Sequence, residues 1–305
     1  MTKVDLITGF LGAGKTTFLS RYGTWLNGQG CRFAVIENEF GAGSVDQTIL
    51  GEEFDHVSEL SGGCICCTMK AGFHNALARL AGNYDRILVE PSGLFDMDEF
   101  FEVLDVLERD GLCEPGMCLT LIDPHCLSGL TSAEQTVLRA ELTGTGAVLW
   151  THADILPVLD EDFAIEQVLN ILNLGESLYF YPVPSHRLTG EDFAVLQRIC
   201  PNRREHRRTP VNHQMLFQST LLRLSGVFEP AKLHHTLAEL IRTEAHGKIL
   251  RVKGFVCAES GSLEVNLTSS GCSVTPCAAR RCILNFIGHD LDRAGLKAAL
   301  QNIAR

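Results

Sequence analysis

The sequence near its start reads Gly9-Phe10-Leu11-Gly12-Ala13-Gly14-Lys15-Thr16-Thr17, and this stretch decides the class of the fold. It fits the pattern G-x-x-x-x-G-K-[ST], with an apolar run at residues 4–8 before it and a predicted helix from about residue 15 to 26 after it. The glycines let successive backbone N–H groups approach phosphate oxygens, and the helix N-terminus adds a partial positive charge. We therefore predict a nucleoside triphosphate site at this loop.

Each part of the loop has a predicted role. Lys15 reaches the β- and γ-phosphate oxygens, and the Thr16 hydroxyl ligates Mg²⁺. The remaining phosphate contacts are assigned to Gly9, Gly12, Ala13, Gly14 and Thr17.

A second acidic element follows further along the chain. A triphosphatase needs a carboxylate at the end of a neighbouring strand, to hold the Mg²⁺ shell or its water. Glu90 ends the apolar run at residues 86–90, and Gly93 would let its backbone N–H approach the γ-phosphate. An ordinary strand that ends in a carboxylate is the alternative, but the phosphate loop favours the functional interpretation.

Three thiols lie between the loop and Glu90, at Cys64, Cys66 and Cys67. Thiolates select Zn²⁺, Cu⁺ or iron–sulfur clusters, and Zn²⁺ most readily accepts three sulfurs with one N or O ligand. Spacing does not choose a fourth ligand among Glu37, Glu39 and His74. Buried packing or a redox pair are the alternatives. Segments in this position of phosphate-loop proteins reorder with the γ-phosphate, so metal binding and triphosphate hydrolysis are predicted to be linked.

The chain is predicted to fold as two domains. Residues 1–200 alternate short apolar runs with helix-length stretches, which predicts an α/β domain with a mostly parallel sheet. Residues 201–215 are polar and arginine-rich, which predicts a linker, and residues 216–305 read as a smaller α+β domain. The expected strands of the first domain are 4–8, 33–37, 86–90, 119–123, 147–151 and 178–181; those of the second are 216–224, 250–258, 263–267 and 282–287.

The composition narrows the class of partner. Hydrophobic residues make up 45% and the formal net charge is -11, which excludes a disordered chain and argues against nucleic acid or a membrane surface as partner. The chain has 12 cysteines and no recognisable export signal or membrane-spanning run. We therefore expect free thiols or metal ligands and a cytoplasmic location.

Taken together, these motifs resemble the CobW-type P-loop GTPases, a family of metallochaperones. The likeness rests on residues 8–17, 37–41, 63–67 and 90–93, with Asp46 and with residues 251–255 and 286–291 in the second half. It implies GTP hydrolysis coupled to handling of Zn²⁺ or Co²⁺ for a client metalloprotein, with the three cysteines and Glu37 at the metal. It also implies a switch segment that includes Glu37, Glu39 and Asp46, and a catalytic set of Lys15, Glu39, Asp46 and Glu90.

The chain departs from the family pattern in three places. The guanine-reading motif, usually [NT]-K-x-D, is here Thr151-His152-Ala153-Asp154. Asp154 can still accept from guanine, while His152 either stacks on the base in place of a lysine stem or is a surface loop histidine. Position 42 is alanine, where relatives often carry a carboxylate. Many relatives also carry a histidine-rich stretch toward the C-terminal half, whereas the histidines in that half of this chain are scattered.

Two other hypotheses and two further signals stay open at this point. The protein could be a metal-buffering or regulatory binding protein with a slow nucleotide switch, or an ATP-dependent phosphotransferase. A second metal site at Cys257, Cys272, Cys277 and Cys282 is weighed against packing, and packing is favoured because their spacing matches no common zinc pattern. Asp123 is predicted to cap the segment that follows it.

Overall fold

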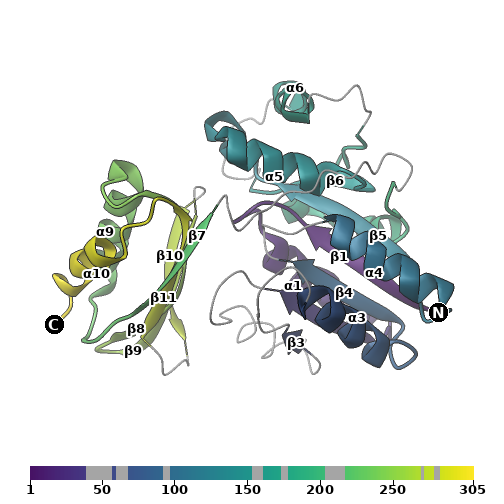
Figure 1. Cartoon of the computed structure of the whole chain (residues 1–305), viewed down its shortest axis with the longest axis horizontal. Helices are drawn as coiled ribbons and strands as arrows, with labels where there is room; N and C mark the ends of the chain where they lie inside the picture. Colours follow the sequence, from purple (N-terminus) through teal and green to yellow (C-terminus); the bar gives the residue numbers. More distant parts are fainter. Residues whose placement is uncertain are drawn as a thin grey trace. The chain divides into compact units, whose positions relative to one another are not determined.

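The computed structural model describes residues 1–38, 57–59, 68–91, 97–152, 161–172, 178–202, 217–268, 271–277 and 282–305. These residues fall into two compact units, an N-terminal unit of residues 1–202 and a C-terminal unit of residues 217–305 (Figure 1). Nearly all of the expected linker, residues 201–215, lies outside the described residues, so the expected domain limits stay a prediction.

The N-terminal unit is built on a six-stranded sheet in the order β3-β2-β4-β1-β5-β6, and every strand pair is parallel. Strands that are apolar on both faces need helices on both sides, and this sheet has them. The strands are β1 (Thr2–Thr8), β2 (Phe33–Asn38), β3 (Val57–Glu59), β4 (Arg86–Pro91), β5 (Cys113–Ile122) and β6 (Ala147–Trp150).

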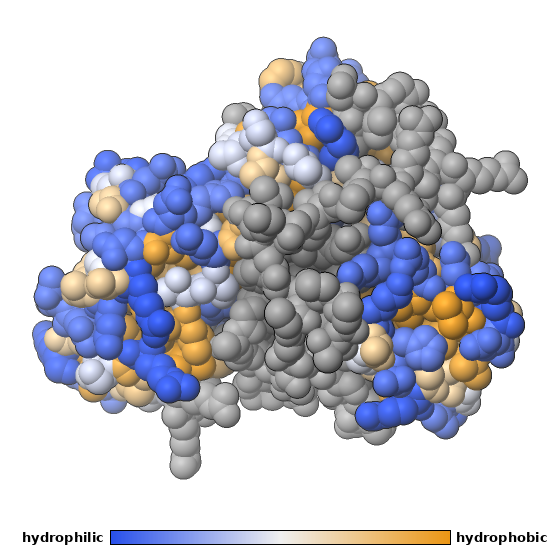
Figure 2. Space-filling model, in the orientation of Figure 1, coloured by the Kyte–Doolittle hydropathy of each residue, from blue (hydrophilic) through white to orange (hydrophobic). Residues whose placement is uncertain are grey.

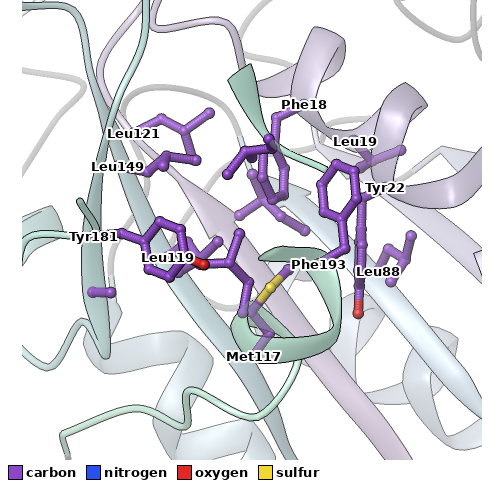
Figure 3. Close-up of a cluster of buried hydrophobic side chains, with 14 of the residues drawn as sticks. Phe18, Leu19, Tyr22, Leu88, Met117, Leu119, Leu121, Leu149, Tyr181 and Phe193 are labelled. Atoms are coloured by element: carbon purple, nitrogen blue, oxygen red, sulfur yellow. The ribbon is translucent and has the colours of Figure 1, made fainter. Parts of the chain in front are cut away.

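Alternate residues of the strands point to opposite helix layers. Ile7 belongs to the core under α1 and α7, whereas Leu6 belongs to the core under α3 and α4. Figure 3 shows the first of these cores, where Tyr22 of α1 and Phe193 of α7 pack beside the strands. The helices are α1 (Lys15–Gly28), α3 (Thr68–Leu80), α4 (Met97–Arg109), α5 (Ser132–Leu142), α6 (Glu161–Leu172) and α7 (Gly190–Leu196), with short 3-10 turns at η1 (Pro124–Gly129) and η2 (Ser185–Arg187).

A buried ion pair joins the centre of this sheet. Asp5 of β1 is fully buried and accepts two hydrogen bonds of 2.7 Å from the Arg86 guanidinium of β4. Its carboxylate also accepts from the Met117 N–H at 2.7 Å and from the Tyr22 hydroxyl at 3.1 Å. Removing one partner of such a pair costs about 3–5 kcal/mol, because a buried charge is left uncompensated. The pair therefore locks β1, β4, β5 and α1 together directly behind the phosphate loop.

The C-terminal unit is an antiparallel sheet in the order β10-β9-β8-β11-β7. Helices α9 and α10 contribute to the same apolar core as the sheet, and Cys272 and Cys282 pack against that core. This confirms the expected α+β architecture. The elements are β7 (Gln218–Arg223), α9 (Pro230–Thr243), β8 (Lys248–Ala258), β9 (Gly261–Thr268), β10 (Gly271–Cys277), β11 (Ile283–His289) and α10 (Arg293–Gln301).

Three strand assignments differ from the sequence-based expectation. The strand expected at residues 178–181 is wrong, because the segment forms a single bridge between Phe180 and Val148. The edge strands β3 and β10 were not expected. β3 has three residues, and β10 alternates exposed and half-buried positions, so neither carries a strong apolar signal. Backbone pairing at a sheet edge, rather than side-chain pattern, makes these strands.

None of the described helices is both long enough and apolar enough to cross a membrane. The face shown in Figure 2 carries many hydrophilic residues, with smaller hydrophobic areas among them.

Candidate nucleotide site

The phosphate loop connects the end of β1 to the start of α1, and its backbone conformation requires glycine. A Cβ at Gly9 would lie 2.3 Å from the carbonyl oxygen of Leu121, so only glycine lets the loop pass this close to β5. Gly14 has φ +80°, in the left-handed region that side chains disfavour, and it is the N-cap of α1. Strand, loop and helix therefore stand in the order that the sequence predicted.

The Lys15 side chain lies over the loop that precedes it. It is 6% exposed, and its ammonium donates to the carbonyl oxygens of Gly9 at 2.6 Å and Phe10 at 3.2 Å. These carbonyls hold the positive charge inside the concavity of the loop. Ala13 is buried and Thr17 is exposed.

Thr16 and Glu90 are in direct contact. The Thr16 hydroxyl donates to Glu90 Oε1 at 2.8 Å, although the two residues are 74 positions apart in the sequence. Glu90 is 7% exposed and lies near the carboxyl end of β4, next to β1 in the sheet. The side chain predicted to ligate Mg²⁺ and the carboxylate predicted to complete its shell are thus brought together.

Glu37 is the register partner of Glu90 on the neighbouring strand β2. Adjacent strands are about 4.8 Å apart, and register partners of a parallel pair share a face of the sheet. Both carboxylates are buried, Glu37 at 3% exposure. Like charges at this spacing repel, and a bound cation would offset the repulsion. The oxygen donors of Thr16, Glu37 and Glu90 fit a hard cation such as Mg²⁺.

The remaining predicted site residues lie outside the described part of the chain: Glu39, Asp46, Cys64, Cys66, Cys67, Gly93 and Asp154. The ends of the cysteine segment can still be placed. Glu59 ends β3, pairs with Glu37 and precedes residues 60–67, and α3 begins at Thr68 after them. Glu59 thus lies at the carboxyl edge of the sheet, the edge at which β1 ends before the phosphate loop. His74 lies further along α3 and is half-buried.

The segment after β6 lies against the phosphate loop. A Cβ at Gly14 would lie 3.7 Å from Cε1 of His152 and 3.8 Å from Cβ of Thr151. The Thr151 N–H donates to the Ile122 carbonyl at 2.9 Å, which ties this segment to the end of β5. The His152 side chain is 30% exposed, and its stacking on a base stays a prediction.

Asp123, at the end of β5, has a role that sequence reasoning missed. Its predicted capping is confirmed, since its Oδ1 accepts from the His125 N–H at 3.0 Å. The same carboxylate also contacts the imidazole Nδ1 of His125 at 2.7 Å and of His152 at 3.1 Å. Burial raises the pKa of Asp123, but hydrogen bonds from His152 and His125 outweigh it and bring the pKa to about 2. The sequence signal that could have indicated this role is the position of Asp123 directly after a strand that ends beside the phosphate loop.

Glu141 of α5 was also missed. It is fully buried, and neither carboxyl oxygen has a hydrogen-bond partner in the described structure. Burial raises the pKa of Glu141 to about 8, while the charge of Lys15 acts to lower it. The carboxyl thus lies within electrostatic reach of the phosphate loop. No sequence pattern distinguishes it from an exposed helical glutamate.

Within the residues that the structure describes, no group of three or more His, Cys, Asp or Glu side chains is arranged to hold a metal ion. In the C-terminal unit, burial raises the pKa values of the Cys272 and Cys282 thiols. Their packing against the core agrees with the interpretation favoured from the sequence.

The fold and this site define a phosphate-loop nucleotide-binding domain followed by a separate α+β unit. Residues 3–175 match the family model of the CobW/HypB/UreG nucleotide-binding domain. Residues 217–304 match the model of the cobalamin synthesis protein cobW C-terminal domain. The chain belongs to the CobW/HypB/UreG family, which confirms the resemblance inferred from its motifs.

Curated relatives share parts of this sequence. The zinc chaperone YjiA of Escherichia coli (strain K12) is 44% identical over 101 residues, which cover 30% of this chain and 31% of the relative. The zinc chaperone YeiR of the same strain is 30% identical over 158 residues, 50% of this chain and 47% of the relative. The zinc-regulated GTPase metalloprotein activator 1 of Schizosaccharomyces pombe is 29% identical over 181 residues, 55% of this chain and 41% of the relative. These alignments span less than half the length of each relative.

Solved structures also resemble this chain. The zinc(II)-bound YjiA GTPase from E. coli is 18% identical, with a TM-score of 0.40 over 100% of this chain and 99% of that chain. HypB from Helicobacter pylori in complex with nickel is 15% identical, with a TM-score of 0.43 over 64% of this chain and 84% of that chain.

Proposed function

We propose that this protein is a GTP-hydrolysing metallochaperone that couples its nucleotide state to the binding and delivery of a divalent metal. The observation that carries the proposal is the contact between Thr16 and Glu90, with Glu37 as the register partner of Glu90. One carboxylate belongs to the proposed Mg²⁺ shell and its neighbour to the proposed metal set. The relatives named zinc chaperones favour zinc as cargo, with cobalt as the second choice. The proposed setting is the cytoplasm, with a client metalloprotein as recipient.

The nucleotide would be held at two ends. Backbone N–H groups of the phosphate loop and of Gly93 bind the phosphates, with Lys15 at the β- and γ-oxygens. Thr151, His152 and Asp154 contact the guanine. The contact of the segment 151–152 with Gly14 supports this, since it sets a base-reading segment beside a phosphate-reading loop.

Hydrolysis requires charge stabilisation and an oriented water. When bound, Mg²⁺ supplies positive charge at the β- and γ-phosphate oxygens, and Thr16 and Glu90 would hold it or its water shell. Lys15 stabilises charge on the transferring phosphoryl group, moving from the loop carbonyls that it contacts here. Glu39, Asp46 or Glu90 positions the attacking water.

The cargo metal would bind to Cys64, Cys66 and Cys67, with Glu37 as an oxygen ligand. A shift of the β2 backbone at Glu37 would also move the β4 backbone at Glu90, because the two strands are paired along their length. Occupation of the metal site and of the triphosphate site would therefore affect each other by the same coupling free energy.

Metal analysis of the purified full chain with and without GTP tests the proposal. We expect one tightly held Zn²⁺ or Co²⁺ per chain whose affinity changes with GTP, and no such metal in the Cys64→Ala, Cys66→Ala, Cys67→Ala triple variant. Cys113→Ala is the matched control, because Cys113 is a buried free thiol in β5. The proposed coupling would be overturned if the triple variant bound as much metal as the wild type, or if the metal affinity of the wild type were the same with and without GTP.

One observation favours a second candidate for the nucleotide. His152 replaces the lysine of the usual guanine-reading motif, so ATP is the competing substrate, as in the phosphotransferase hypothesis. Side-by-side affinities for GTP and ATP decide this point. If ATP bound more tightly than GTP, the phosphotransferase hypothesis would take the place of the GTPase proposal.

A further inference from the structure

Asp123 lies between two imidazoles at the rim of the proposed nucleotide site. Its side chain is 2% exposed, those of His125 and His152 are 24% and 30% exposed, and both rings turn Nδ1 toward it. The carboxylate contacts His125 through Oδ1 and His152 through Oδ2. One buried anion thus holds two rings from different elements, one from η1 and one from the segment after β6.

This arrangement determines where the protons lie. A carboxylate only accepts hydrogen bonds, so the Nδ1 atom of each ring must carry a proton and donate. The low pKa of Asp123 agrees with a carboxylate that stays ionised at neutral pH. The tautomer of His152 is therefore set by Asp123, and its Nε2 lies on the opposite edge of the ring.

That opposite edge faces the phosphate loop. A Cβ at Gly14 would lie 3.7 Å from Cε1 and 3.8 Å from Nε2 of His152. The backbone of His152 has φ +50°, a left-handed conformation that is uncommon for residues other than glycine. Here the bond to Asp123 holds the ring beside Gly14 of the loop.

We propose that Asp123 is the positioning residue that orients the His152 ring for its contact with the nucleoside of the bound nucleotide. The inference rests on the proposed nucleotide site and adds to it the residue that orients the ring. Asp123 acts through His152 and touches no phosphate itself. In this chain, a histidine–aspartate pair would determine how tightly the nucleoside end of the ligand is held.

His125 provides the internal comparison. It binds the same carboxylate, but its Nε2 is buried and has no hydrogen-bond partner among the described residues. Its N–H and its ring both serve the turn η1. The two rings therefore differ in one respect that the proposal uses: the His152 ring lies against the phosphate loop.

The test uses the full chain and two identical substitutions, His152→Asn and His125→Asn. Asparagine tolerates the left-handed backbone of residue 152 and can still donate to Asp123, so folding is preserved. Dissociation constants are measured by calorimetry for GDP and for inorganic tripolyphosphate, each with Mg²⁺. We expect His152→Asn to weaken GDP about tenfold or more and tripolyphosphate less than about twofold, with His125→Asn below about twofold for both.

Asp123→Asn completes a double-mutant cycle. Alone it should weaken GDP about three- to tenfold, because the amide no longer determines which ring nitrogen carries the proton. Combined with His152→Asn it should add little, since Asp123 acts through His152. Melting temperatures of all variants confirm that each is folded.

The outcomes separate the two proposals. Equal loss for GDP and tripolyphosphate, additive effects in the cycle, or equal effects of the two histidine substitutions would each overturn the role of the pair. If the wild-type chain bound tripolyphosphate and no guanine nucleotide, the proposed function would fail instead.

Discussion

The two units of this protein differ in how many charged side chains they bury. In the C-terminal unit, Lys253 is the one charged side chain that is buried among the described residues. The described part of the N-terminal unit buries Asp5, Lys15, Glu37, Arg86, Glu90, Asp123, Glu134 and Glu141. Because burial of charge is costly, such groups mark places where specific pairing or chemistry compensates. The contrast indicates that the N-terminal unit carries the chemistry and that apolar packing stabilises the C-terminal unit.

Among the substitutions that test this contrast between the units, Lys15→Ala has the largest expected effect. Loss of the charge at the transferring phosphoryl group should lower GTP turnover by about 10³-fold or more. Lys70→Ala is the control, because Lys70 is a half-exposed lysine of the same unit that pairs with Glu102. It should leave turnover within about twofold. Turnover by Lys15→Ala near that of the wild type would refute the assigned site.

The buried pair behind the loop predicts the next largest effect, on stability. Arg86→Leu should lower the free energy of unfolding by about 3–5 kcal/mol, because Asp5 keeps an uncompensated buried charge. The double variant Asp5→Leu, Arg86→Leu should recover part of this loss in urea unfolding. Arg32→Leu removes the exposed pair with Asp85 and should leave the urea midpoint of unfolding nearly unchanged. Equal effects of the buried and the exposed pair would remove the distinction.

For the apolar core of the C-terminal unit we expect a loss of stability that comes from packing and not from charge. Leu237 of α9 is fully buried, and Leu237→Ala should cost about 2–5 kcal/mol through lost burial and the cavity left behind. This loss should not depend on pH or salt, since no charge is involved. His234→Ala, on the exposed face of the same helix, should change stability by less than about 0.5 kcal/mol. A strong pH dependence for Leu237→Ala would contradict the contrast between the units.

The smallest expected effect is a gain in stability rather than a loss, and it concerns Glu141. The pKa of Glu141 is raised from 4.5 to about 8, so the folded state keeps a proton that the unfolded state releases. The contribution of Glu141 to stability is therefore present below pH 4.5 and is lost as the pH rises through about 8. Glu141→Met should stabilise the protein by about 1–3 kcal/mol at pH 8, because an unpaired buried carboxylate is removed.

Melting curves of Glu141→Met at several pH values check this sign. The gain should shrink as the pH is lowered toward 4.5. Glu166→Met on α6 is the control for an exposed helical glutamate. A variant that is less stable than the wild type at pH 8 would show that Glu141 makes a net favourable interaction, with Lys15 as its candidate partner.

Local features of the sequence were sufficient for part of this site. The phosphate loop was predictable because its glycines, lysine and threonine are consecutive and lie between a strand and a helix. Glu90 was predictable because a carboxylate after an apolar run reaches the carboxyl edge of a parallel sheet. Glu37 was assigned by resemblance to the family, and its pairing with Glu90 became visible only with the strand order.

Other features depend on which elements become neighbours. Asp5 in an apolar strand carried no sign of its partner, because Arg86 is 81 residues away. Asp123 was predicted as a local cap, and its bond to His152 depends on β5 and β6 being adjacent. A cap involves neighbours along the chain, whereas this bond crosses between segments 29 residues apart.

The kind of ligand could be predicted from the sequence alone, because a phosphate-binding loop is built from consecutive residues whose backbone does the binding. So could the α/β and α+β character of the two units, through the period of their apolar residues. The contact of Glu90 with Thr16, its pairing with Glu37 and the position of the His152 ring beside Gly14 became known only from the three-dimensional fold. The physical reason is that contacts between distant segments depend on strand order and register, which are set by the packing of the whole unit.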